Sequence, residues 1–106
     1  MPERYRLEYL PLARQDMVDI VRYISRELQN PTAARRTANA LIETAARIAA
    51  FPYANPVHVP LRPLQQEYRK ALSGNYYMFY HVDEARAVVT VDRVLYASRS
   101  EDALLK

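Results

Sequence analysis

Cysteine and tryptophan are absent from the 106-residue chain, and glycine occurs once, at Gly74. Without cysteine the chain can form no disulfide and no thiolate metal site. Its two histidines, His58 and His81, are isolated from each other in the sequence, so we expect neither a metal nor another cofactor. A single glycine also excludes the glycine-rich loops that hold nucleotide phosphates.

Long apolar runs are missing as well. No stretch approaches the ~20 apolar residues of a membrane helix, and the first residues, MPERYRLEY, lack the apolar core of a secretory signal. We therefore expect a cytoplasmic protein without membrane contact. Half of the residues are hydrophobic and 25% are charged, which is typical of a chain that folds around a core. The length predicts one domain, residues 1–106, and the net charge of +3 permits an acidic partner or nucleic acid without requiring either.

The first half of the chain predicts a strand and two helices. Residues 4–9 alternate polar and apolar side chains, as a half-buried strand does. Pro11 suits the first turn of a helix, where its missing N–H does no harm. The expected apolar stripe of this helix is Met17, Ile20, Val21, Ile24 and Leu28. Asn30 and Pro31 then predict the N-cap and first residue of a second helix that ends near Ala50.

Prolines interrupt the chain after the second helix and predict an extended connector that contains Phe51 and Tyr53 as an aromatic plug. Beyond it, three strands are predicted, at residues 67–72, 76–82 and 87–96, with turns between them. Along the last strand we expect Val89, Val91, Arg93 and Leu95 on one face and Val88, Thr90, Asp92 and Val94 on the other.

The predicted fold class is α+β: an N-terminal strand, a helical hairpin, and a three-stranded antiparallel sheet that ends in a short turn at residues 100–105. If the first strand lies beside the last, the two would pair in parallel, since the helical hairpin separates them.

This order of elements, together with three motifs, resembles the RelE/ParE toxins of type II toxin–antitoxin systems. The resemblance covers residues 5–104. The motifs are LARQDM at residues 12–17, the hairpin segments 68–72, 74–76 and 79–82, and VDRVLY at residues 91–96 followed by Arg99. Family members are neutralised by an antitoxin whose C-terminal segment wraps around the toxin, so the resemblance implies a cognate antitoxin as partner.

The family has two branches, and departures from one of them favour the other. RelE-like members cut messenger RNA in the ribosome, whereas ParE-like members poison DNA gyrase and are not nucleases. Where RelE-like ribonucleases carry an arginine early in the middle strand this chain has Tyr77, and where they carry a cation past the last strand it has Ala97. Their C-terminal tyrosine or histidine is missing from residues 102–106. Because tyrosine has no fixed positive charge at neutral pH, the ParE-like branch is the better match.

The resemblance then predicts a toxin without catalytic residues that binds DNA gyrase. The residues predicted to contact the target are Arg69, Arg93, Tyr96 and Arg99. In the RelE-like alternative, with ribosome-bound mRNA as partner, His81 would act as acid or base and two of these arginines, Arg69 and Arg93, would hold phosphate. A second alternative is a decayed toxin that only binds its antitoxin. Whether the chain forms a homodimer stays open.

Each candidate also has a structural interpretation. His81 stands beside the turn at residues 83–86 and is typical of a surface histidine; nothing in the sequence places it near Arg93. Arg93 alternates with valines, so its guanidinium could pair with a carboxylate such as Asp92 or Glu67 while its stem covers apolar surface. Arg69 is equally consistent with a solvated strand end.

Overall fold

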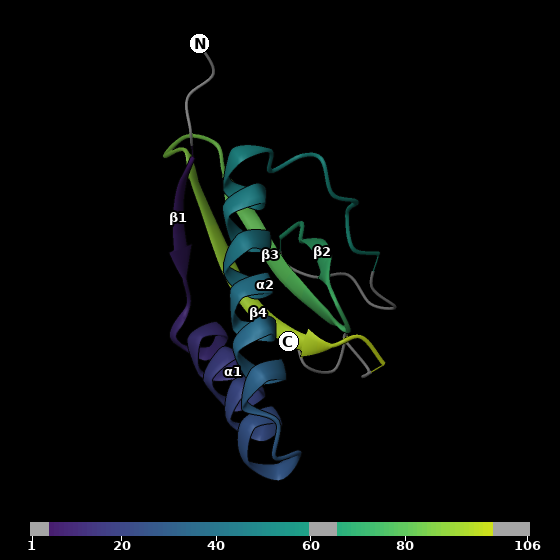
Figure 1. Ribbon diagram of the computed structural model, residues 1–106. Helices are drawn as coiled ribbons and strands as arrows, with labels where there is room; N and C mark the ends of the chain where they lie inside the picture. The colour runs from purple at the N-terminus through teal and green to yellow at the C-terminus, as the bar shows by residue number, and fades with distance from the viewer. Residues whose placement is uncertain (1–4, 60–65, 99–106) are drawn as a thin grey trace.

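A computed structural model describes residues 5–59 and 66–98. In chain order the elements are β1 (Arg6–Tyr9), α1 (Pro11–Arg22), a π-helical turn η1 (Tyr23–Glu27), α2 (Pro31–Ala50), β2 (Arg69–Ser73), β3 (Tyr76–Asp83) and β4 (Val88–Tyr96). The predicted α+β class is confirmed (Figure 1). The sheet has four strands instead of three because β1 joins it. The predicted turn at residues 100–105 lies outside the described residues.

The sheet has the strand order β1-β4-β3-β2. β1 runs parallel to β4, in a register that pairs Arg6 with Val88 and Tyr9 with Val91, while the other two pairings are antiparallel. This confirms the expected parallel pairing of the first and last strands. The β2–β3 hairpin closes with a two-residue turn whose first residue, Gly74, has φ +59, a conformation that glycine adopts without strain.

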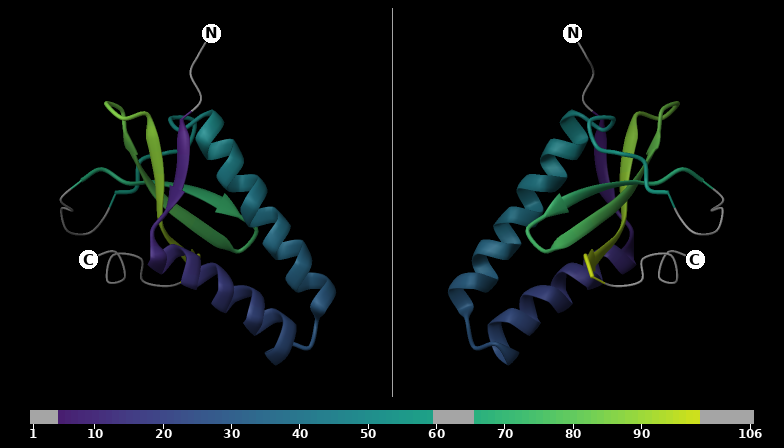
Figure 2. Two further views of the ribbon diagram at one scale, coloured as in Figure 1. Left: turned by 90° about the vertical axis from the view of Figure 1, so that its left-hand side faces the viewer. Right: turned by 90° about the vertical axis from the view of Figure 1, so that its right-hand side faces the viewer.

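Both helices lie on the same side of the sheet and meet at the hairpin turn (Figure 2). The core between the two layers is apolar, and Ala45 and Met78 within it are fully buried. α2 buries Ala34, Leu41, Thr44, Ala45 and Ile48. Small residues on that face allow α2 to approach its neighbours closely. No helix in the described ranges 5–59 and 66–98 is long and apolar enough to cross a membrane.

The second helix of the hairpin, α2, begins at the residue predicted from the sequence. The Asn30 side chain accepts a hydrogen bond from the Ala33 N–H at 3.1 Å, and Pro31 is the first residue of α2. The end of the first helix differs from the prediction, because its last turn is a π-helix with one extra residue. Ile24 remains buried, but Leu28 is 56% exposed. Leu28 therefore does not belong to the apolar stripe.

The side chains of β4 also do not alternate strictly between the two faces of the sheet. The pairing of β3 with β4 shifts between Phe79 and Tyr80, so that Phe79 faces Arg93 and Tyr80 faces Val91, with Asp92 as the extra residue of a β-bulge. Beyond the bulge every side chain changes sides. Val94 joins the main core, whereas Leu95 packs with Phe79 on the opposite face. The predicted grouping of Leu95 with Val89 and Val91 is therefore wrong.

Backbone strain in the β3–β4 turn gives a first testable prediction. Ala87 has φ 54, in the left-handed region that a side chain disfavours. Ala87→Gly is expected to raise the free energy of unfolding by about 1 kcal/mol, measured by urea denaturation, because it removes this strain. Ala85→Gly is the matched control in the same turn: Ala85 is not at positive φ, so the added glycine should only lower stability. Equal effects of the two substitutions would contradict the prediction.

Candidate functional site

Arg93, near the end of β4, is held by an acidic residue from the first helix. Its Nε donates to Asp16 Oδ2 at 2.8 Å and its Nη2 to Asp16 Oδ1 at 2.9 Å. The same carboxylate accepts the backbone N–H of Val94 at 2.9 Å. The side chains of Arg93 and Asp16 are only 16% and 12% exposed. Asp16 thus binds both the side chain and the backbone of this part of β4.

The topology explains why Asp16 occupies this position. β1 pairs with β4 only as far as Val91, and α1 begins immediately afterwards, so it lies along the edge of β4 that β1 leaves open. The Asp16 carboxylate satisfies the Val94 N–H at that edge in place of a neighbouring strand. Hydrogen bonding to Asp16 raises the pKa of Arg93 above its usual range. The predicted pairing of Arg93 with a carboxylate is found, but the partners named from the sequence, Asp92 and Glu67, are wrong.

Tyr96, the last residue of β4, has a partly exposed side chain. It is 46% exposed, and its ring makes an edge contact with Tyr76 at 5.7 Å between centroids. Tyr76, the first residue of β3, pairs with Tyr96 at the end of the hairpin farthest from the β3–β4 turn. The ring of Tyr96 can therefore contact a partner without leaving its packing position. Arg99, the fourth residue predicted to contact the target, lies outside the described residues.

Arg69 is occupied by the connector. Its Nη1 donates to the Asn55 carbonyl at 2.7 Å, its guanidinium carbon lies 5.0 Å from the centre of the Tyr53 ring, and its Nη2 lies 3.8 Å from Glu67. Only 19% of its side chain is exposed. Arg69 is therefore a residue that fastens the connector to β2, and it is not the solvated strand end that the sequence allowed.

The structure does not bring the predicted arginines together on one face of the sheet. Arg69 pairs with Tyr80, whose side chain lies in the core under the helices. Arg93 pairs with Phe79, whose side chain belongs to the cluster on the other face. Because directly opposed residues share a face, the two arginines leave the sheet on opposite sides. Arg69 and Arg93 therefore do not share one face of the sheet.

The face of the sheet turned away from the helices carries a histidine–aspartate pair. His81 Nδ1 lies 2.6 Å from Asp92 Oδ1, and the Tyr68 ring meets the His81 ring edge-on at 6.0 Å. The Asp92 side chain is 9% exposed and that of His81 22%. Since Nδ1 faces Asp92 and no described residue hydrogen-bonds Nε2, that second nitrogen is the atom available to a ligand. His81 is thus half-buried and oriented, unlike the surface histidine expected from its neighbouring turn.

Burial raises the pKa of Asp92, and the nearby His81 opposes this shift. A carboxyl group whose folded-state pKa is raised contributes stability below its unfolded-state pKa and loses that contribution as the pH rises through the folded-state value. Asp92→Asn keeps a hydrogen-bonding side chain beside His81 without the charge. We expect the variant to be more stable than the wild type at neutral pH, with the difference shrinking in acid. Urea unfolding across the pH range measures the difference in the free energy of unfolding between the variant and the wild type. A difference independent of pH would contradict a raised pKa of Asp92.

A second polar cluster fastens the connector to the strands. Glu84, in the β3–β4 turn, accepts hydrogen bonds from the Tyr5 hydroxyl, at 2.6 Å to Oε1, and from the Tyr53 hydroxyl. The bond to Glu84 raises the pKa of Tyr53 to about 12. On the inner side Tyr80 donates to the Pro52 carbonyl at 2.5 Å. Within the described part of the chain no group of three or more acidic, histidine or cysteine side chains is arranged to hold a metal ion.

The comparisons with known proteins identify this fold. The model of the ParE toxin of type II toxin–antitoxin systems matches residues 7–101, nearly the whole chain. The chain belongs to the ParE toxin family. It is thereby a toxin of a type II toxin–antitoxin system, as the resemblance in its sequence implied. No curated protein is similar enough in sequence to count as a match.

Solved structures of both branches share the fold. The toxin–antitoxin complex RelBE2 from Mycobacterium tuberculosis has a chain with 21% identity and a TM-score of 0.65, covering 89% of this chain and 99% of its own. A chain of the chromosomal ParDE system from P. aeruginosa has 13% identity and a TM-score of 0.69, with coverages of 90% and 98%. An E. coli RelE mutant in the free state has 20% identity and a TM-score of 0.61, with coverages of 96% and 93%. At such identities the likeness shows the fold alone.

Sequence reasoning missed two residues of the toxin that matter most for these sites. Asp16 lies in the LARQDM motif, to which the resemblance assigns no role, and no local pattern connects it with Arg93 across the length of the chain. The sequence suggests Asp92 only as a partner of Arg93, whereas the structure pairs it with His81. A bulge in β4 moves Asp92 beside His81, and the sequence carries no clear signal for a bulge at that position.

Proposed function

We propose that the toxin inhibits growth by binding DNA gyrase and that it makes or breaks no covalent bond. The match to the ParE toxin model supports the gyrase branch. One observation supports action by binding without catalysis: both arginines that a ribonuclease would use to hold phosphate already donate hydrogen bonds to protein acceptors. Arg93 is bonded to Asp16, and Arg69 is bonded to the connector. An arginine whose guanidinium already donates to protein acceptors is a poor ligand for the phosphate of an RNA substrate.

The end of β4 is the proposed contact with the target. Tyr96 supplies an exposed aromatic surface there, and Arg99, which follows in the sequence, supplies a positive charge. Arg93 would act by fixing the course of β4 through Asp16. Arg69 sits two strands away, under the connector, so we leave it out of the contact.

A cognate antitoxin is the proposed second partner. Among the similar structures, one is described as a toxin–antitoxin complex, one as an archaeal RelE–RelB complex and one as a chromosomal ParDE TA system, which supports the same arrangement for this chain. A tail that is disordered when free would order on the toxin and prevent contact between the toxin and its target. Neutralisation would then follow from competition for surface, without any change in the fold of the toxin.

Expression of the chain without antitoxin tests this function. We expect growth arrest, relaxed and damaged DNA and intact transcripts in the same cells. Tyr96→Ala combined with Arg99→Ala should restore growth at equal levels of folded protein. Arg93→Ala is unsuited to this test, because it leaves the Asp16 carboxylate unpaired and destabilises the fold. Full toxicity of the folded Tyr96/Arg99 variant would remove the end of β4 from the mechanism.

One observation favours a second candidate function, RNA cleavage. Asp92 orients His81 and leaves Nε2 available, an arrangement suited to a general base. His81 Nε2 would take the proton of a ribose 2′-hydroxyl, whose oxygen would attack the adjacent phosphorus and displace the 5′-oxygen, which takes up a proton from an acid. Asp92 would be a positioning residue.

The two functions separate in one experiment. If RNA cleavage is correct, expression of the toxin cuts translated messages, His81→Ala abolishes the cuts, and Asp92→Asn shifts the pH profile of cleavage by the purified toxin on ribosomes. If gyrase binding is correct, transcripts stay intact and His81→Ala is as toxic as the wild type.

A further inference from the structure

The tip of the helical hairpin holds the net positive charge of the chain. Residues 22–42 contain four arginines and one acidic residue, Glu27, so their net charge is +3. The whole chain also has a net charge of +3, and its remaining residues are therefore balanced in charge. The tip, where η1 and α2 meet, lies beyond the ends of the strands (Figure 2). A polyanion would be attracted to this end of the molecule.

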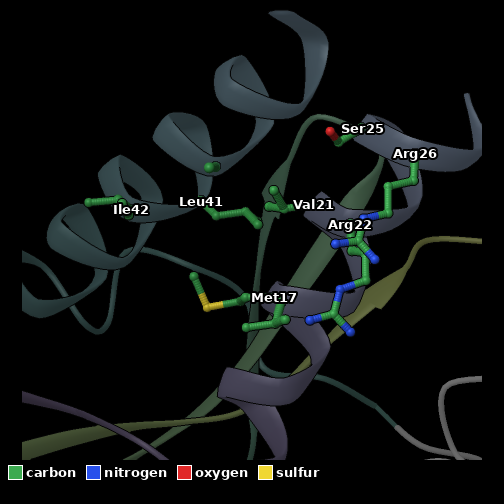
Figure 3. A pocket seen from close by; sticks show the side chains of 9 residues that line it. Met17, Val21, Arg22, Ser25, Arg26, Leu41 and Ile42 are labelled. Atoms are coloured by element: carbon green, nitrogen blue, oxygen red, sulfur yellow. The ribbon is translucent and has the colours of Figure 1, made fainter. Parts of the chain in front are cut away.

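Three of the four arginines border the groove between the two helices. The residues that line this groove include Met17, Val21, Arg22, Arg26, Leu41 and Ile42. Arg22 ends α1 and Arg26 follows four residues later in η1, and both extend on the side of the groove away from Ile42 (Figure 3). Arg35 precedes Ile42 by seven residues, or two helical turns, so it lies on the face of α2 that carries Ile42. Positive charge thus flanks the groove from both helices.

These three guanidinium groups have no protein partner within the part of the chain that the structure describes. All three side chains are exposed, and none forms an ion pair or a side-chain hydrogen bond with a described residue. Asp19, one turn before Arg22, accepts a hydrogen bond from the Gln15 amide at 2.8 Å and forms no ion pair with a described residue. Like charges one turn apart repel each other, so an anion that binds both Arg22 and Arg26 relieves that repulsion.

The spacing of Arg22 and Arg26 suits the phosphates of a DNA strand. Residues four apart on a helix are separated by about 6 Å along its axis, and every second phosphate of one strand by about 6.8 Å along the duplex. A guanidinium also binds phosphate through two parallel hydrogen bonds, a geometry that the ammonium group of lysine does not offer. Arg35, on the second helix, would meet a further phosphate beside this pair.

The hairpin turn is less suited to an anionic lipid surface. Helices that lie on a membrane insert large apolar side chains along one face. In the turn, residues 28–30, Leu28 is apolar and 56% exposed, but it stands beside the polar Gln29 and Asn30. Charge without an inserting apolar face favours a nucleic acid as the partner.

Tyr76 links the hairpin tip to the end of β4. Its ring contacts the ring of Tyr96, with 5.7 Å between the centroids. Burial raises the pKa of Tyr76, and the nearby hydroxyls of Tyr96 and Tyr23 raise it further. Tyr23 directly follows Arg22 in the chain. DNA bound at the tip would therefore lie beside the proposed contact with gyrase.

We propose that the hairpin tip binds the phosphate backbone of duplex DNA through Arg22, Arg26 and Arg35, independently of the base sequence. The proposal rests on the proposed function in one respect, since gyrase acts on duplex DNA and is where the toxin would meet it. In that complex the three arginines hold the DNA while the end of β4 contacts the enzyme.

Fluorescence anisotropy with a labelled duplex of mixed sequence tests the proposal, with the full chain and without gyrase. Each phosphate contact contributes about −0.9 to the slope of the logarithm of the association constant against the logarithm of the salt concentration, so three contacts predict a slope of about −2.7. Arg22→Gln/Arg26→Gln should reduce the slope to about −0.9 and weaken binding at low salt about tenfold. A duplex of unrelated sequence should bind the wild type with the same affinity.

Arg36→Gln/Arg47→Gln is the matched control. It removes the same amount of charge from two exposed residues that lie eleven positions apart, on the face of α2 turned away from the groove. Neither residue lines the groove. This variant should keep the slope of the wild type, and circular dichroism should show that both variants are folded.

Each other outcome overturns the proposal. Absence of binding to the duplex at low salt would remove the DNA contact, and a slope reduced equally by both variants would show that net charge alone decides binding. Tighter binding to a single-stranded RNA of the same length, or binding to phosphatidylglycerol vesicles without binding to the duplex, would assign the tip to a different polyanion. Failure of the proposed function is read separately, because gyrase would then supercoil DNA normally in the presence of a toxin that still binds the isolated duplex.

Discussion

Replacing Asp16 with alanine is expected to lower the free energy of unfolding by about 3 kcal/mol, the scale for removing one partner of a buried ion pair. Asp16 accepts two hydrogen bonds from Arg93 and one from the Val94 N–H. All three hydrogen bonds to Asp16 are lost at once, and the Arg93 side chain, which is 16% exposed, has little access to water in compensation. Chemical denaturation of the purified variant measures the loss.

Asp19→Ala supplies the control for this prediction. Asp19 lies on the same helix, is exposed, and accepts a single hydrogen bond from the Gln15 side chain at 2.8 Å. Its removal should change stability by no more than about 0.5 kcal/mol. If Asp16→Ala lowers the free energy of unfolding as little as Asp19→Ala does, the contact between α1 and β4 does not stabilise the end of the sheet.

Saturation with the cognate antitoxin is expected to raise the melting temperature of the toxin by roughly 10–20 °C. A partner that binds only the folded state adds about 2.7 kcal/mol when its free concentration is about 100 times Kd, and a domain of this size gains about 4–8 °C per kcal/mol. The apolar side chains exposed along the helical hairpin, such as Val18 and Ile42, are surface that a partner can cover. Calorimetry of the toxin alone and in complex measures the shift.

An antitoxin that lacks its C-terminal segment is the control for the melting experiment. It should leave the melting temperature of the toxin unchanged, because that segment is the part expected to wrap the toxin. A melting temperature unaffected by the full-length antitoxin at saturation would contradict binding to the folded toxin.

Local rules predicted the elements well because their signals are themselves local. The start of α2 is marked by Asn30 and Pro31, and the Asn30 side chain caps a backbone N–H only three residues away. The turn at Gly74 is marked by the glycine itself, which adopts a positive φ without strain. The parallel pairing of β1 with β4 followed from chain direction once the two were assumed to be neighbours.

The site was harder to predict because its contacts depend on departures from regular geometry. The bulge at Asp92 reverses the facing of β4 and brings a carboxylate to His81. The π-helical turn removes Leu28 from the apolar stripe and places Arg26 beside the groove. Each departure inserts a single residue into a repeating element, and periodicity alone does not show where an insertion falls. Asp16 and Arg93 meet only because α1 follows the short strand β1 along an open edge.

Supercoiling by purified DNA gyrase in the presence of the folded toxin tests the central claim most directly. We expect the wild type to block supercoiling in a dose-dependent way, the Tyr96→Ala/Arg99→Ala variant to have lost this effect, and a ribosome-bound message in a parallel reaction to remain whole. Gyrase that works normally at every toxin concentration, beside a message that is cut by the wild type and spared by His81→Ala, would contradict the account and establish RNA cleavage by the histidine–aspartate pair.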